Sequence, residues 1–130
     1  MPSLQFYQSL PEMGAFPDFY MEGYTEALQL IKGVRVVPNS TFVEDLSKDY
    51  RDMFNLVGYP SYYVPIKVGK EHYGFTLKGS KTKKNPHFSL WLNMFNIEAI
   101  YADSPYLFVV EGIKDAYLWL YYGLPGVAIS

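Results

Sequence analysis

The side chains best suited to chemistry stand around residue 111. Glu111 directly follows an apolar run at residues 106–110, Gly112 comes next, and Asp115 stands four residues after the glutamate. A carboxylate at the carboxyl end of a buried strand can coordinate magnesium or move a proton. Gly112 permits a tight turn and exposes backbone N–H groups at the start of a helix. The alternative is that Glu111 only stabilises that helix through its dipole.

A block of positive charge precedes this motif. Residues 61–90 contain six Lys or Arg against one Asp or Glu, whereas residues 1–60 contain four against eight and residues 91–130 contain one against four. Both histidines, His72 and His87, also lie in the basic block. Such a local field attracts phosphates, although a run of lysines is more often a solvated loop.

Aromatic side chains are interleaved with these lysines. Tyr73, Phe75 and Phe88 are suited to stacking on the unpaired bases of a single-stranded nucleic acid. Aromatic residues are more often buried in a core, so packing is the alternative function of these rings.

The composition excludes several classes of site. The chain of 130 residues has no cysteine, which rules out disulfides, cysteine-bound zinc and a thiol nucleophile. Apolar residues make up 49% of the chain, enough for a packed core. No run of about 18 apolar residues is present to span a membrane, and no signal peptide is recognisable. We therefore expect a cytoplasmic protein without a membrane partner.

Two helices are predicted in the first 60 residues. Thr25 is suited to cap a helix that Gly33 ends. A capping box formed by Thr41 and Glu44 opens a longer helix, whose apolar residues recur at helical spacing until Gly58 ends it. Ser40 is the alternative cap of this second helix.

Strands are predicted before and after the second helix. Residues 34–37 form a short strand, and residues 62–68 and 73–79 form a β-hairpin. Pro65 indicates an edge or a bulge in this hairpin. Residues from His87 onward read as a third strand or as the start of a helix.

The last 25 residues read as a β-α-β unit. The apolar run 106–110 has the character of a strand buried in a parallel sheet. A helix follows Gly112 and ends at Gly123, and a second strand begins directly after it. In such units the ligand lies at the carboxyl ends of the strands, which is where Glu111 stands.

This stretch resembles the first motif of the Toprim domain. The shared features are an apolar strand, the pair Glu111-Gly112, an acidic residue at position 115, a helix, Gly123 and a second apolar strand. Toprim domains occur in DnaG-type primases, primase-helicases, topoisomerases and some nucleases. The resemblance implies that Glu111 serves metal or acid–base chemistry in nucleotidyl transfer, with Mg²⁺ as the cofactor, and that Gly112 and Asp115 support the motif.

The upstream sequence favours the primases within this group. Residues 62–88, YYVPIKVGKEHYGFTLKGSKTKKNPHF, resemble the subdomain that precedes Toprim in DnaG-type primases, with a Pro-Ile strand, a charged turn, a Gly-Phe strand and a basic stretch. Together the resemblance covers residues 60–130. It implies that lysines of this region contact the phosphates of the template or the nucleotide, namely Lys67, Lys78, Lys81, Lys83 and Lys84. Lysines neutralise phosphate charge and carry no base information.

The fold class predicted from these features is α+β. We expect residues 1–103 to form a small mixed α/β subdomain that contains an antiparallel β-hairpin. We expect residues 104–130 to form the first β-α-β part of an α/β Toprim domain.

Two elements of a primase are absent from the sequence. A Toprim site needs a second acidic cluster, Asp-x-Asp, to hold magnesium, and no such pair occurs in this chain. Without cysteine there is also no zinc module. We therefore expect a primase region truncated within Toprim, from a bacterium or a phage, that is inactive alone.

The predicted partners are single-stranded DNA and ribonucleotides. A replicative helicase, or a chain that completes the Toprim sheet, is also expected. The alternative functions are a non-catalytic module that binds single-stranded nucleic acid, another Toprim protein such as a nuclease or a topoisomerase, and an unrelated α+β protein in which the Glu-Gly turn arose by chance.

Overall fold

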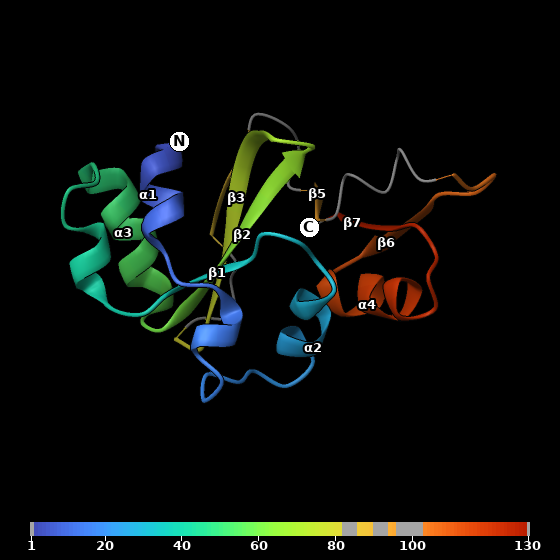
Figure 1. The fold of residues 1–130 in the computed structure, drawn as a ribbon, viewed down its shortest axis with the longest axis horizontal. Coiled ribbons are helices and arrows are strands. Elements are labelled where there is room, and N and C mark those ends of the chain that lie inside the picture. The colour runs from blue at the N-terminus through green and yellow to red at the C-terminus, as the bar shows by residue number, and fades with distance from the viewer. Residues whose placement is uncertain (1, 82–85, 90–93, 96–102, 130) are drawn as a thin grey trace.

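The computed structural model describes residues 2–81, 86–89, 94–95 and 103–129 (Figure 1). The described helices are α1 (Leu4–Ser9), α2 (Tyr24–Gln29), α3 (Lys48–Val57) and α4 (Ile113–Tyr121), with the 3₁₀ turns η1 (Met13–Ala15) and η2 (Ser40–Val43). The described strands are β1 (Arg35–Val37), β2 (Ser61–Val68), β3 (Glu71–Gly79), β4 (His87–Ser89), β5 (Met94–Phe95), β6 (Phe108–Glu111) and β7 (Gly126–Ile129).

The larger sheet is antiparallel and has the strand order β1-β2-β3-β4. Strands β2 and β3 form the predicted hairpin, with Gly69 and Lys70 at its turn. Residues 87–89, for which the sequence predicts either a strand or the start of a helix, form strand β4 and pair with β3. Strand β1 pairs with residues 61–63 of β2 and does not reach Pro65. Among the described strands, Pro65 therefore has a neighbour on one side, which is β3, and such an edge position tolerates proline.

The smaller sheet contains the predicted β-α-β unit. Its strand order is β5-β7-β6, in which β6 and β7 are parallel and β5 is antiparallel to β7. Helix α4 connects the two parallel strands and packs on both of them. The chain is therefore a mixed α+β protein with one antiparallel sheet and one small sheet that holds a parallel pair.

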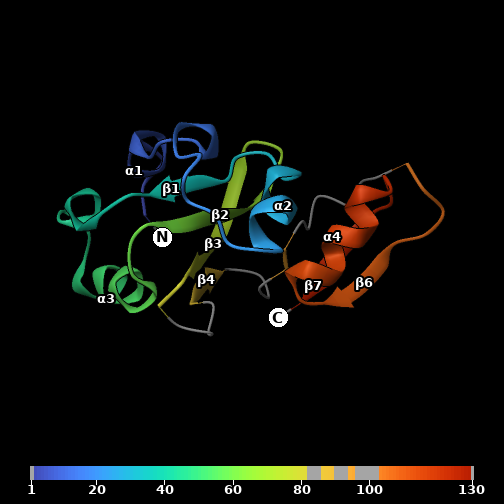
Figure 2. The same cartoon turned by 90° about the horizontal axis from the view of Figure 1, so that it is seen from below.

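Helices cover both faces of the larger sheet (Figure 1). Helices α1 and α3 pack on one face, and the buried side chains there form the first core: Phe6, Tyr7, Leu10, Val37, Val43, Phe54, Val57, Tyr63, Phe75 and Leu77. Helices α2 and α4 pack against each other on the opposite face (Figure 2). The second core there consists of Ala27, Leu28, Val34, Val36, Tyr62, Val64 and Ala116. Alternate residues of β1 and β2 point into the two cores, as the period of a strand requires.

The predicted long helix before Gly58 is divided in two. Residues 40–43 form the turn η2, which Asn39 caps by accepting a hydrogen bond from the Thr41 N–H at 3.0 Å. Helix α3 begins only after Ser47. The predicted capping box of Thr41 is therefore wrong, because Thr41 lies inside a separate turn. The predicted end at Gly58 is confirmed, with φ 80° at that residue.

Helix α2 also begins differently from the prediction. Its N-cap is Gly23 rather than Thr25, and the Glu26 side chain accepts a hydrogen bond from the Gly23 N–H at 2.8 Å. The Thr25 hydroxyl is buried and is hydrogen-bonded to the Tyr62 hydroxyl at 2.7 Å. Thr25 therefore fastens the helix to β2 instead of capping it.

Strand β6 is not buried on both faces as its apolar sequence predicts. It lies at one side of the small sheet, with Phe108 and Val110 half-buried and Val109 57% exposed. The Phe108 ring stacks on Trp119 of α4 at 4.0 Å between ring centroids. Helix α4 thus covers one face of β6, and the described residues leave the face that carries Val109 in contact with solvent.

Candidate functional site

The carboxyl end of β6 holds the residue on which the sequence motif depends. Glu111 is the last residue of β6 and is exposed. Gly112 follows with φ 88°, a conformation that strongly favours glycine, and α4 begins at the next residue. Glu111 is level with Ile129 of β7 in the parallel register. The carboxyl ends of both strands therefore meet at one side of the sheet, with the glutamate side chain in solvent.

Asp115 lies close to this end of the sheet, in the first turn of α4. Its side chain is exposed. The Gly112 carbonyl accepts a hydrogen bond from the Ala116 N–H at 3.3 Å, which closes that first turn. An acidic residue at this position is stabilised by the helix dipole. The structure thus places both predicted acidic residues at the start of α4.

Glu111 and Asp115 do not belong to a larger cluster of metal-ligating side chains among the described residues. Within the described residues, no group of three or more histidine, aspartate and glutamate side chains is arranged to hold a metal ion. A protein magnesium site commonly draws on carboxylates together with phosphate oxygens of the substrate. Glu111 and Asp115 are two carboxylates that could contribute to such a site, and the expected Mg²⁺ stays a prediction.

Lys78 occupies a place that the sequence does not predict. Its side chain is buried, with 6% of its surface exposed, and its ammonium group lies 4.2 Å from the ring centroid of Tyr24. Lys78 is paired across the hairpin with Tyr62, whose side chain is in the second core. The long side chain therefore crosses apolar surface to reach an aromatic face. This position does not suit the expected contact with phosphates.

The other predicted lysines are distributed over the hairpin. Lys67 is half-buried and faces His72 near the turn, whereas Lys81 is exposed beyond the far end of β3. The residues of β3 from His72 to Gly79 span roughly 24 Å at about 3.4 Å per residue. The remaining pair, Lys83 and Lys84, lies outside the described residues. The described lysines therefore do not form one continuous basic surface.

The aromatic residues of the hairpin divide in a similar way. Phe75 is fully buried in the first core, where its ring stacks on Tyr63 at 4.9 Å. Packing is therefore the function of this ring, and base stacking is not. Tyr73 is half-buried. The side chain of Phe88 lies outside the part of the chain that is described.

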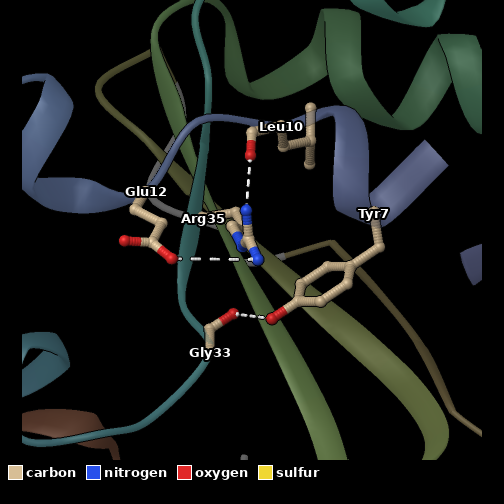
Figure 3. Close-up of polar contacts among 5 residues, drawn as sticks. All are labelled: Tyr7, Leu10, Glu12, Gly33 and Arg35. Carbon is tan, nitrogen blue, oxygen red and sulfur yellow. Dashed lines mark hydrogen bonds and ion pairs between the residues drawn. The ribbon is translucent and has the colours of Figure 1, made fainter. Parts of the chain in front are cut away.

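Sequence reasoning missed a polar cluster around Tyr7 (Figure 3). The Tyr7 hydroxyl donates a hydrogen bond to the Gly33 carbonyl at 2.5 Å, and the Arg35 guanidinium lies 4.8 Å from the Tyr7 ring centroid. Arg35 also donates a hydrogen bond to the Leu10 carbonyl at 2.8 Å and forms an ion pair with Glu12 at 4.0 Å. The members come from α1, the loop after it, the loop before β1 and β1 itself, so no local sequence motif predicts the cluster.

A cleft lies beside this cluster. It has a volume of about 370 Å³ and opens between α1 and the turn of the β2–β3 hairpin. Its polar lining includes Lys70, Glu71 and His72, and its aromatic lining consists of Tyr7 and Tyr63. The signal in the sequence that points to this cleft is the placement of His72 inside the basic block.

Comparison of the chain with protein-family models, with curated proteins and with solved structures found no match. None of the described helices is both long enough and apolar enough to cross a membrane.

Proposed function

We propose that this chain is part of a DnaG-type primase, a protein that makes RNA primers on single-stranded DNA. In this proposal residues 104–130 are the start of a Toprim domain, and Glu111 stands where nucleotidyl transfer takes place. The observation that supports it best is the exposed Glu111 at the carboxyl end of β6, followed by the positive-φ Gly112 and by α4 in a parallel β-α-β unit.

Glu111 is suited to holding or moving a proton at this position. Phosphoryl transfer depends mainly on positioning and on neutralising charge, and a carboxylate beside the reacting hydroxyl can accept its proton. The described residues supply neither a second acidic cluster nor a metal site there. The proposal therefore includes a further chain or segment that supplies those acidic groups and completes the sheet.

The exposed residues of the small sheet support such a partner. Tyr106 is 69% exposed and Val109 is 57% exposed, although both belong to the apolar run 106–110. Apolar side chains on a strand at the side of a sheet are a common place for another strand or helix to pack.

The test is binding of a labelled single-stranded oligodeoxynucleotide, followed by fluorescence anisotropy over a salt series without divalent ions. We expect affinity to fall steeply as salt increases, because phosphate contacts release counterions. If the strand passes the carboxyl end of β6, Glu111→Gln removes a repulsive charge and tightens binding about threefold at low salt. The matched control is Asp103→Asn, which removes the same charge from an exposed residue on the amino-terminal side of β6.

Two results would contradict the proposal. One is absence of binding at low salt. The other is an equal change in affinity for Glu111→Gln and Asp103→Asn, because net charge alone would then explain both. Binding that is indifferent to Glu111 but is weakened by Lys81→Ala would favour the alternative of a non-catalytic binding module.

A further inference from the structure

The cleft between α1 and the hairpin turn has the size of a small-molecule site. Its volume of about 370 Å³ lies within the usual range of ligand pockets, roughly 300–1,000 Å³. Two segments of the chain form its walls. One wall consists of the N-terminal residues Pro2, Ser3, Leu4 and Tyr7, and the other of the hairpin residues Tyr63, Lys70, Glu71 and His72. The walls are thus partly aromatic and partly charged.

An irregularity in the hairpin directs His72 toward this cleft. The pairing register shifts between Ile66 and Lys67, so that Ile66 is opposite Gly74 and Lys67 is opposite His72. Regular alternation would put His72 on the same face as Gly74, toward the second core. The bulge instead brings its ring to the α1 side, where it meets Tyr7 edge-on at 4.9 Å between centroids. Bulges that redirect a side chain are common beside functional sites.

Positive groups outnumber negative ones around His72. Lys67 is its direct cross-strand neighbour, and Lys70 lines the cleft at the turn. A Cβ placed on Gly33 would lie 3.0 Å from the Lys67 Nζ and 2.8 Å from the Tyr7 hydroxyl. The Lys67 ammonium and the Tyr7 hydroxyl therefore both lie close to Gly33. The one acidic side chain in the lining is Glu71, which is exposed.

The environment of His72 already disfavours a positive charge on its ring. Partial burial lowers the pKa of His72 below its ordinary value of 6.5, the neighbouring Lys67 charge lowers this pKa further, and Glu71 raises it by less. The other groups that face the ring are Tyr7 and Tyr63 from α1 and β2, together with Lys70 at the turn. An anion in the cleft would offset the lysine charges and favour protonation of His72.

The aromatic wall is held in place before any ligand binds. The hydrogen bond from the Tyr7 hydroxyl to the Gly33 carbonyl fixes one end of the ring (Figure 3). The Arg35 guanidinium lies over the same ring, and Arg35 is itself held by Glu12 and by the Leu10 carbonyl. A wall fixed in this way lowers the entropy cost of binding.

We propose that this cleft binds a phosphate monoester, with the phosphate held by Lys70 and His72 and the body of the molecule against Tyr7 and Tyr63. Ammonium and imidazolium groups form strong charge-assisted hydrogen bonds to phosphate oxygens. The cleft is larger than a phosphate group, and its aromatic wall suits an organic substituent. This site is separate from Glu111 and does not depend on the primase proposal.

The experiment is an NMR titration of the ¹⁵N-labelled chain with inorganic phosphate, adenosine 5′-monophosphate and adenosine, at constant pH and ionic strength. We expect both phosphate probes to shift the amides of residues 70–72 and of Tyr7, and adenosine to leave them unchanged. Lys70→Ala should weaken binding of the monophosphate about tenfold, the usual effect of losing one charge-assisted hydrogen bond. The matched control is Lys32→Ala, an exposed lysine outside this cleft.

A second measurement follows the pKa of His72 itself. The ring resonances are titrated with and without sulfate, whose charge stays constant over the range, with His87 as the internal reference. Sulfate should raise the pKa of His72 by about one pH unit and leave that of His87 unchanged. The proposal is overturned if neither phosphate probe shifts residues 70–72, if adenosine binds as well as its monophosphate, or if both variants weaken binding equally.

Discussion

Lys78 and Glu111 show that the surroundings of a charged residue determine whether it stabilises the fold or can contact a ligand. Lys78 is buried with its ammonium over Tyr24, and Glu111 is exposed at the end of β6. A buried charge needs a compensating partner, because leaving water is costly. The aromatic face of Tyr24 supplies part of that compensation for Lys78. Glu111 keeps its water and remains available to a ligand.

We predict that Lys78 contributes to stability rather than to nucleic-acid binding. Lys78→Ala should lower the free energy of unfolding by about 1–3 kcal/mol, because it removes the buried stem and the contact with Tyr24. Lys78→Met keeps the apolar stem and should cost less, about 1 kcal/mol or below. Urea unfolding measures both values, with the exposed Lys81→Ala as a control within about 0.5 kcal/mol. A stable Lys78→Ala protein with weakened DNA binding would show that this lysine reaches the surface.

At the scale of elements, the β6-α4-β7 unit depends on close contact between its helix and its second strand. A Cβ placed on Gly126, the first residue of β7, would lie 2.8 Å from the Trp119 Cβ of α4. Trp119 in turn stacks on Phe108 of β6. Glycine at position 126 thus lets the helix lie on both strands at once.

We predict that Gly126→Ala separates α4 from the small sheet. The added methyl group has to displace the Trp119 side chain, and overpacking of this kind costs about 1–3 kcal/mol. Urea unfolding measures the loss. The matched control is Gly14→Ala, because a Cβ there would meet no atom within 4 Å. Equal stability of the two variants would contradict the close packing of β7 on α4.

At the scale of the whole molecule, the second core joins the two sheets. Ala116 of α4 is fully buried in it together with Leu28 of α2 and Val64 of β2. The sequence places a domain boundary at residues 103 and 104, and this core contains residues from both sides of it. Shared burial of this kind favours unfolding as one cooperative unit.

We predict that Ala116→Leu destabilises the small sheet and the larger sheet together. In the wild type, the most protected amides of α4 and of β2 should exchange with similar free energies of opening. The larger side chain should lower the opening free energies of α4 and β2 alike, by about 1–3 kcal/mol, because both segments open when the whole unit unfolds. Native-state hydrogen exchange measures both. Val109→Ala, on the exposed face of β6, is the control with little expected effect. A loss confined to α4 would contradict this prediction, because it would show that the small sheet opens independently of the larger one.

The sequence by itself determined the local features of this protein. The strand-like runs 62–68 and 73–79 predicted the hairpin, and the Glu111-Gly112 pair between an apolar run and a helix pattern predicted the β-α-β unit. These features depend on residues that are close in the chain, so strand period and turn chemistry are sufficient to predict them. The position of Glu111 at a strand end follows from the same reasoning.

Only the tertiary structure decided which polar residues are buried and which share a site. Thr25 bonds to Tyr62 instead of capping its helix, and Lys78 is buried over Tyr24. The cleft at His72 brings α1 together with a hairpin turn more than 60 residues away in the sequence. A one-residue bulge sets the face on which His72 lies, and it does so by reversing the alternation that a sequence pattern assumes. Burial and convergence depend on contacts between distant segments, which local spacing does not encode.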